Sequence, residues 1–363
     1  MKDGQRTFRN TGEDIASILR TAWRQSPDQS ESPFVQKPIG SLLLDSGCGA
    51  LGWWRIRGGA LASFAGPGLQ QAFRFHALEA VRRKRDLEFV LRAFNDVGLK
   101  PILFKGWTLT QFYALPALRP YGDFDILVDD NDALTARNVI SGLPENLRTL
   151  VDLDMRVFQR FLPDRSYAQL AARASTGEVG EGQFRLLAPE DHLRLVCLHQ
   201  LDHGAWRPLW LCDVAAFIEH LPPNFHWGLC LEGNARLSEG VVALVSLAEQ
   251  LLSARVPFGT PTKRVPAWFR DAVLRGWASG YRAPPESLHN LRRLEWRQAA
   301  KAVAARWPDA VTSTLHLRAP FRGVPRTILQ LAELGRRTFH FLCHSWLGRT
   351  GKLLSSVERR GLP

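Results

Sequence analysis

Apolar residues recur at helical spacing in the first and last parts of the chain, and in short continuous runs between them. Residues 69–97 predict one long helix, and a shorter helix is expected over 13–25. The stretch 40–68 interrupts its apolar residues with glycines and predicts no single element. Beyond Pro189, helical patterns are expected at residues 189–203, 208–221, 235–254, 266–278 and 289–306.

The middle of the chain has the pattern of a small sheet. Short apolar runs predict strands at residues 101–104, 123–128, 149–155 and 182–187, the last of them closing the sheet. Helices are expected between them at residues 107–114, 131–142 and 166–172. This order predicts an α+β fold with a small mixed β-sheet. We expect a helical N-terminal region (1–98), a core (99–188) and a helical C-terminal domain (189–363).

Two of the predicted strands carry acidic residues. Asp123 and Asp125 are two positions apart, so their side chains point to the same face of a strand. Two carboxylates side by side are costly unless a cation lies between them, and Mg²⁺ prefers oxygen ligands. Asp152 on the next acidic strand is the expected third carboxylate, as metal ligand or general base, and Asp154 on the same face is the alternative. Three such acids suit a two-metal phosphoryl or nucleotidyl transfer site.

Residues around these strands are candidates for binding a nucleotide. Gly106 permits close approach of a phosphate to the backbone, and the Lys105 ammonium supplies a positive charge; an ordinary strand-to-helix turn is the alternative. Arg119 has two expected uses, clamping phosphate oxygens or pairing with an acid to hold its loop. Trp107 is expected in the core, with stacking on a base as the alternative.

A pair of histidines lies one helical turn apart in the predicted helix 189–203. His199 and His203 both face one side, where contact with the acceptor substrate is a candidate role. A zinc-protease motif is excluded, because Gln200 rather than Glu follows the first histidine. His192, near the helix start, and Asp213, in the next helix, are weaker candidates for site residues. The sequence also has no Walker-type phosphate loop, dinucleotide glycine motif or kinase signature.

Composition gives expectations about binding partners, disulfides and location. The net charge of +12 and pI near 10 favour anionic partners such as nucleotides or RNA, or reflect solubility alone. Five scattered cysteines without a Cys-x-x-Cys motif argue against a disulfide framework. No signal peptide and no run of about 20 apolar residues is found, so a cytoplasmic location is expected. The basic stretch from Arg318 predicts an amphipathic helix that packs on the protein or, alternatively, on a membrane surface.

The motifs Leu103-Phe-Lys105-Gly106, Arg119 and Asp123-Phe-Asp125-Ile-Leu-Val occur in this order, with Tyr113 between the first two. Together they resemble the uncharacterised bacterial nucleotidyltransferase family of the polymerase-beta superfamily. Val151-Asp152-Leu-Asp154-Met is similar to the third-carboxylate strand of that family, where Asp-Leu-His-Trp is common. Asp154 therefore stands where the family often has His.

The resemblance spans residues 70–220, because the segments around His192, His199 and Asp213 are similar to the family's helical part. It implies a nucleotidyltransferase core that moves a nucleoside monophosphate from an NTP to an acceptor hydroxyl or phosphate, with Mg²⁺. The acceptor would be a small molecule, a sugar or a peptide. The alternatives are RNA as acceptor, as in toxin-like nucleotidyltransferases, and an inactive nucleotide-binding scaffold.

Overall fold

The computed structural model describes residues 2–27, 39–59, 62–153, 160–280 and 306–340. The chain divides into two compact units, Met1–Arg282 and Ala283–Pro363. The sheet and every residue of the candidate site belong to the first unit. The three-part division predicted from the sequence stays a prediction.

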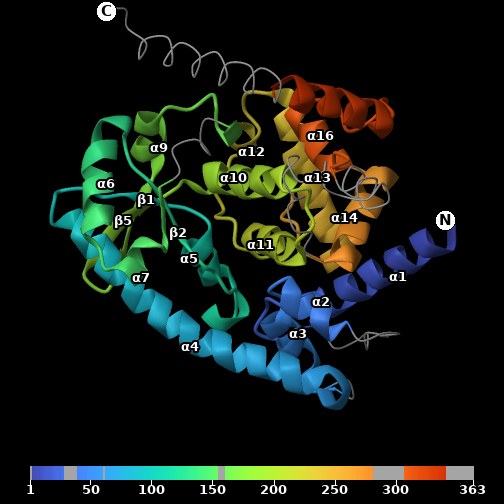
Figure 1. Ribbon diagram of the computed structural model, residues 1–363, viewed down its shortest axis with the longest axis horizontal. Coiled ribbons are helices and arrows are strands. Elements are labelled where there is room, and N and C mark those ends of the chain that lie inside the picture. Colours follow the sequence, from blue (N-terminus) through green and yellow to red (C-terminus); the bar gives the residue numbers. More distant parts are fainter. Residues whose placement is uncertain (1, 28–38, 60–61, 154–159, 281–305, 341–363) are drawn as a thin grey trace, which may run out of the picture. The chain divides into compact units, whose positions relative to one another are not determined.

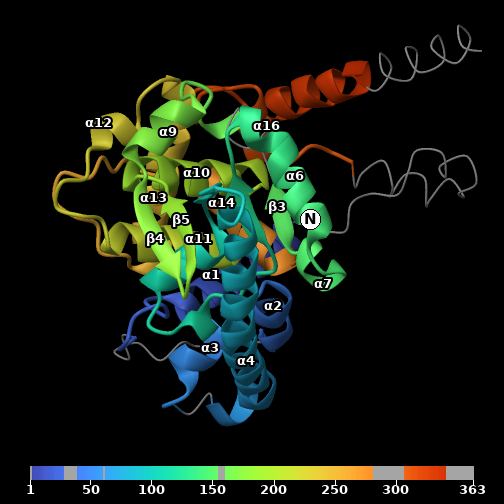
Figure 2. The same cartoon turned by 90° about the vertical axis from the view of Figure 1, so that its left-hand side faces the viewer.

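Five strands form one mixed sheet, which confirms the predicted α+β fold (Figures 1 and 2). The strands are β1 (Ile102–Leu103), β2 (Phe124–Leu127), β3 (Val151–Leu153), β4 (Ser175–Val179) and β5 (Gly182–Leu186). Their order across the sheet is β3-β2-β1-β5-β4. β1 pairs antiparallel with β2 and parallel with β5, and β2 pairs parallel with β3.

β4 has no counterpart in the prediction, and it changes the place of β5. The sequence Ser-Thr-Gly-Glu-Val of β4 has one strongly apolar residue, so its pattern does not predict a strand. It forms an antiparallel hairpin with β5 through a turn in which Gly180 has φ +56°. β5 therefore lies between β1 and β4. The prediction that this strand closes the sheet at an edge is wrong.

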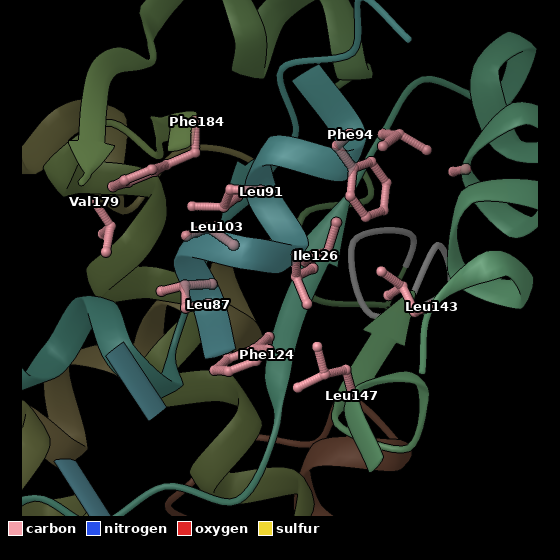
Figure 3. Close-up of a cluster of buried hydrophobic side chains, with 13 residues drawn as sticks. Leu87, Leu91, Phe94, Leu103, Phe124, Ile126, Leu143, Leu147, Val179 and Phe184 are labelled. Carbon is pink, nitrogen blue, oxygen red and sulfur yellow. The ribbon is translucent and has the colours of Figure 1, made fainter. Parts of the chain in front are cut away.

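One face of the sheet packs against a long helix, α4 (Ala62–Asn95), and against α6 (Ala133–Gly142) and α7 (Glu145–Arg148). Figure 3 shows this core, in which Leu87 and Leu91 of α4 lie against the β1 and β2 side chains. Burial of each such side chain contributes about 1.5–3 kcal/mol. The helix predicted at 69–97 is thus confirmed, with an earlier start. Near its N-terminus α4 packs against α2 (Gly40–Asp45) and α3 (Gly49–Ile56), which the sequence left unassigned (Figure 1).

The opposite face of the sheet packs against α9 (Tyr167–Arg173) and α10 (Pro189–Asp202). Side chains alternate along β2, so Phe124 and Ile126 enter the first core while Asp125 and Leu127 face α10. This alternation places the acid of β2 on the face that carries the site.

Helices follow the sheet as the sequence predicts. They are α10, α11 (Pro208–Glu219), α12 (Trp227–Cys230), α13 (Ala235–Leu252) and α14 (Ala267–Ser279). Of these, α12 was not predicted, and the helix expected at 289–306 falls almost wholly outside the described residues. At the N-terminus, α1 (Lys2–Leu19) packs along α14, where Arg270 pairs with Glu13 at 3.0 Å.

The second unit contains α16 (Ala310–His316) and a helical stretch at residues 326–340. Glu333, whose side chain is fully buried, accepts hydrogen bonds from Arg336 and Arg337 and pairs with His316. Leu331 and Phe339 are exposed on the same stretch. Its packing on the protein or on a membrane surface stays a prediction. No helix in the described ranges is both long and apolar enough to cross a bilayer.

Candidate functional site

Three aspartates converge at one edge of the sheet. Asp125 lies in β2 directly opposite Asp152 of the parallel strand β3, and Asp123 immediately precedes β2. One carboxylate oxygen of each lies within 4.8 Å of those of the other two. Asp125 is 5% exposed, whereas Asp123 and Asp152 are open to solvent. The three residues predicted from the strand pattern therefore form a single cluster; Asp154 lies outside the described residues.

The cluster already contains one protein cation. The Lys105 ammonium nitrogen lies 2.6 Å from Asp125 Oδ1, and both side chains are largely buried. Burial raises the pKa of Asp125 to about 6; the Lys105 charge opposes this rise, and the negative charges of Asp123 and Asp152 add to it. One ammonium group thus offsets only part of the repulsion among three carboxylates.

The backbone turn that carries Lys105 is unusual. Lys105 has φ +56° and ψ −151°, a region that residues with a side chain rarely occupy, and Gly106 follows with φ +41°. The Lys105 amide donates to His192 Nε2 at 3.3 Å, and Thr108 Oγ1 donates to the Lys105 carbonyl at 2.6 Å. A Cβ on Gly106 would lie 3.1 Å from the Asp123 carbonyl oxygen. This turn therefore lies close against the acidic cluster, before the short helix α5 (Gly106–Leu109).

Residues 107–114, predicted as one helix, are divided between α5 and a 3₁₀ helix, Thr110–Phe112. Further 3₁₀ helices span Pro116–Leu118 and Asp130–Asp132. Trp107 packs edge-on against Phe184 at 5.5 Å between ring centroids, which is the core position expected for it.

A second acid–base pair lines one cavity together with the acidic cluster. Arg119 donates from Nε and Nη2 to the two carboxylate oxygens of Asp213, at 3.0 and 2.8 Å. Tyr113 Oη donates to Asp213 Oδ1 at 2.7 Å, and burial raises the pKa of this phenol well above its usual value. Both charged side chains are at most 8% exposed. Of the two uses expected for Arg119, the geometry favours pairing with an acid that holds its loop.

An aromatic wall faces the cavity from α10 and α11. The rings of His199 and His203 lie 4.6 Å apart, and both contact Trp210, at 5.5 and 5.3 Å. Burial lowers the pKa of both histidines, so the rings are neutral at pH 7. Arg160, paired with Asp202, lies at the same wall. The helical spacing predicted this pair of histidines facing one site, and the structure places them there.

These features surround a cavity of about 1130 Å³, large enough for a nucleotide with part of a second substrate. The cavity also contains residues that sequence analysis did not identify: His76 of α4, Gly47 between α2 and α3, Arg137 of α6 and Arg207 before α11. They come from segments that are far apart in the chain and carry no shared motif. No spacing rule would have brought them together.

The donor set of the acidic cluster fits a divalent metal such as Mg²⁺. Three carboxylates within 4.8 Å of one another are hard oxygen ligands, and two of them are accessible to solvent. Burial raises the pKa of Asp125, and the negative charges of Asp123 and Asp152 add to this rise, while Lys105 is the one cation paired with it. A cation would relieve this repulsion.

A small mixed sheet with three converging carboxylates beside a Lys-Gly turn has the composition of a phosphoryl-transfer site. The family of uncharacterised nucleotidyltransferases matches residues 66–143 and 144–253, together just over half of the chain, and the protein belongs to this family. The comparisons with curated proteins and with solved structures gave no match.

Proposed function

We propose that the protein transfers a nucleoside monophosphate from an NTP to an acceptor hydroxyl or phosphate, with Mg²⁺ held by Asp123, Asp125 and Asp152. The observation that carries the proposal is the convergence of these three carboxylates from two neighbouring parallel strands. Membership of a nucleotidyltransferase family supports the reaction class. In the reaction, the acceptor oxygen bonds to the α-phosphorus of the NTP, and the bond from that phosphorus to pyrophosphate breaks.

The three aspartates have different environments that suit different tasks. Asp125 is buried and oriented by Lys105, which makes it a fixed ligand. Asp152 is exposed and lies opposite Asp125 on the same face of the sheet, so it can bind metal or take the proton of an acceptor hydroxyl. Bound Mg²⁺ would neutralise phosphate charge and lower the pKa of the attacking hydroxyl.

Lys105 and Gly106 bind the nucleotide phosphates in this proposal. The Lys105 ammonium lies at the acidic cluster, so a phosphate that bridges to the metal would come within its reach. Gly106 leaves the backbone open at the start of α5, where amide hydrogens are available to oxygen acceptors. Arg119 holds Asp213 and positions the loop that leads into β2.

The wall of His199 and His203 is the proposed contact surface of the acceptor. Neutral imidazoles beside Trp210 offer both hydrogen bonds and stacking, which suits a small molecule, a sugar or a peptide. RNA is the second candidate acceptor, since the net charge of +12 favours a polyanion. RNA binding that weakens steeply with salt would support it, and no binding at low salt would exclude it.

Calorimetry of NTP binding with and without Mg²⁺ tests the proposal, using wild type and the double variant Asp123→Asn, Asp125→Asn. Wild type is expected to bind the NTP in a Mg²⁺-dependent way, and the double variant to lose that dependence. The pair Asp130→Asn, Asp132→Asn is a matched control, because it has the same spacing and lies outside the cavity. Binding that is unaffected by the first pair would refute the assigned site.

Turnover separates an enzyme from a scaffold. Labelled NTP incubated with candidate acceptors should yield labelled acceptor and pyrophosphate in wild type and neither in the double variant. Metal-dependent binding without any turnover across acceptor classes would favour an inactive nucleotide-binding scaffold.

A further inference from the structure

One wall of the cavity holds a cationic corner, defined here as Arg207, His76 and Gly47. It belongs to neither the acidic cluster nor the histidine wall. His76 comes from α4, Gly47 from the turn between α2 and α3, and Arg207 is the residue before α11. All three line the cavity.

Arg207 differs from Lys105 and Arg119, two other cations that line the cavity. Lys105 is paired with Asp125, and Arg119 with Asp213. Within the described residues, Arg207 forms no ion pair, and its guanidinium donates from Nε alone, to the Ser46 carbonyl oxygen at 2.8 Å. Its two Nη groups have no protein acceptor there. Arg207 is half-buried, and this burial of its charge lowers the pKa of the guanidinium. Such a charge is costly without an anionic partner.

The surroundings fix the guanidinium in place. The Nε bond to Ser46 holds one edge, and the Trp210 ring lies 5.6 Å from the guanidinium carbon. Gly47 has φ +75°, and a Cβ there would lie 2.4 Å from Arg207 Nη2. A glycine at this turn therefore leaves the room that the guanidinium occupies. A side chain positioned in this way has lost most of its freedom before a ligand arrives.

His76 adds a second polar side chain that has no hydrogen-bond partner among the described residues. Its ring lines the cavity, and it forms no hydrogen bond in the described part of the chain; its Nδ1 is buried and unsatisfied. Burial lowers the pKa of His76; the Glu79 charge opposes this fall, and the Arg207 charge adds to it. On the other side, the Asp123 charge acts on Arg207. The corner is thus close enough to the acidic cluster for one bound substrate to span both.

We propose that the cationic corner is an anion-binding subsite that takes a phosphate group of a substrate. Guanidinium groups bind phosphate oxygens through two parallel hydrogen bonds, and the two Nη groups of Arg207 are free to do so. The identity of the molecule that carries the phosphate, NTP or acceptor, rests on the proposed function. The subsite itself does not.

Equilibrium dialysis of the full chain against labelled inorganic phosphate, without Mg²⁺, tests the subsite. Arg207→Gln is expected to weaken phosphate binding at least about tenfold, as loss of charged hydrogen bonds does. His76→Gln should weaken it less. Arg137→Gln is the matched control, because it removes an exposed arginine from the same cavity, and it should weaken binding by no more than about twofold.

Two outcomes would overturn the proposal: no phosphate binding by wild type, or equal binding by wild type and Arg207→Gln. If Arg207→Gln fails to fold in a thermal melt, Arg207→Lys replaces it, since it keeps the charge but loses the paired donors. The phosphate affinity of Arg207→Lys should be lower than that of wild type; an affinity equal to wild type would overturn the role of the guanidinium.

A second arm identifies the source of the phosphate. If the subsite serves the NTP, a non-hydrolysable NTP with Mg²⁺ displaces phosphate, and Arg207→Gln weakens NTP binding. If it serves the acceptor, phosphate binds alongside the analogue, and Arg207→Gln leaves NTP affinity unchanged. The double variant Asp123→Asn, Asp125→Asn should still bind phosphate. Failure of metal-dependent NTP binding is thereby distinguished from failure of the subsite.

Discussion

Two acid–base pairs line the same cavity and differ in nearly every physical respect. Asp213 is 1% exposed, and Arg119 and Tyr113 donate three hydrogen bonds to its carboxylate. Asp125 is also buried, but Lys105 is its cationic partner and two further carboxylates lie beside it. The first pair is balanced in charge and hydrogen bonds. The second carries an excess of negative charge.

This difference indicates which of the two pairs would be stabilised by a bound cation. A saturated pair such as Asp213 with Arg119 has nothing to gain from a ligand, and its loss would leave a buried charge alone. The cluster around Asp125 gains from any cation that enters, because repulsion among its carboxylates is only partly offset. We therefore propose that the Arg119–Asp213 pair positions its loop and that the sheet-edge cluster carries out the chemistry.

The largest expected effect is on stability, from Asp213→Ala. This substitution leaves the Arg119 guanidinium buried without its partner, so the free energy of unfolding should fall by about 3–5 kcal/mol. Denaturant unfolding at pH 7 measures the change. Asp123→Ala is the contrasting variant: removing this exposed carboxylate, one of three that repel one another, should change stability by about 0.5 kcal/mol or less. Equal losses in the two variants would erase the distinction between the pairs.

A smaller effect is expected from pH, through His192. The His192 ring accepts a hydrogen bond from the Lys105 amide at 3.3 Å. Burial, together with the charges of Arg119 and Lys105, lowers the pKa of His192 to about 3. In the unfolded chain His192 becomes protonated below about pH 6.5, whereas in the folded chain it stays neutral until about pH 3. The free energy of unfolding should therefore decrease over this window as pH falls, by up to about 1.4 kcal/mol per pH unit from this group.

His192→Gln isolates that contribution. The variant should lose less stability than wild type between pH 6.5 and pH 5, as measured by urea unfolding. Its stability at pH 7.5, where the ring is neutral in both states, reports the packing and hydrogen bonds that the substitution removes. An unchanged pH dependence would show that His192 does not titrate as described.

The smallest expected effect is local, from Lys105→Met. Removing the ammonium group takes away the charge that lowers the pKa of Asp125, so that pKa should rise above about 6 in metal-free protein. Carboxyl-carbon NMR titration measures it. The matched variant Arg92→Met removes a cation paired with Glu181 on the exposed side of α4 and should leave the Asp125 titration unchanged. A pKa of Asp125 that stays in place would mean that the ion pair does not form in solution.

Much of the core follows from local pattern. The strands of Asp125 and Asp152 are short apolar runs, and alternation of side chains makes Asp123 and Asp125 share a face in any sheet that contains them. The helices α4, α10, α11 and α13 have apolar spacing that a single sequence displays. β4 was not predicted from the sequence because its residues are mostly polar and it is a strand through its pairing with β5.

The sequence by itself determined the α+β class, the acids on one strand face and the pair of histidines one helical turn apart, because each depends on periodicity within a few residues. Only the tertiary structure decided that Arg119 pairs with Asp213, 94 residues away, and that Arg207 lies against Gly47 and lines the same cavity as His76. Such contacts form when separate elements pack, and no local pattern encodes which residues then face each other. The acids of the cavity therefore follow from strand pattern, and the contacts of its arginines follow from the packing of separate elements.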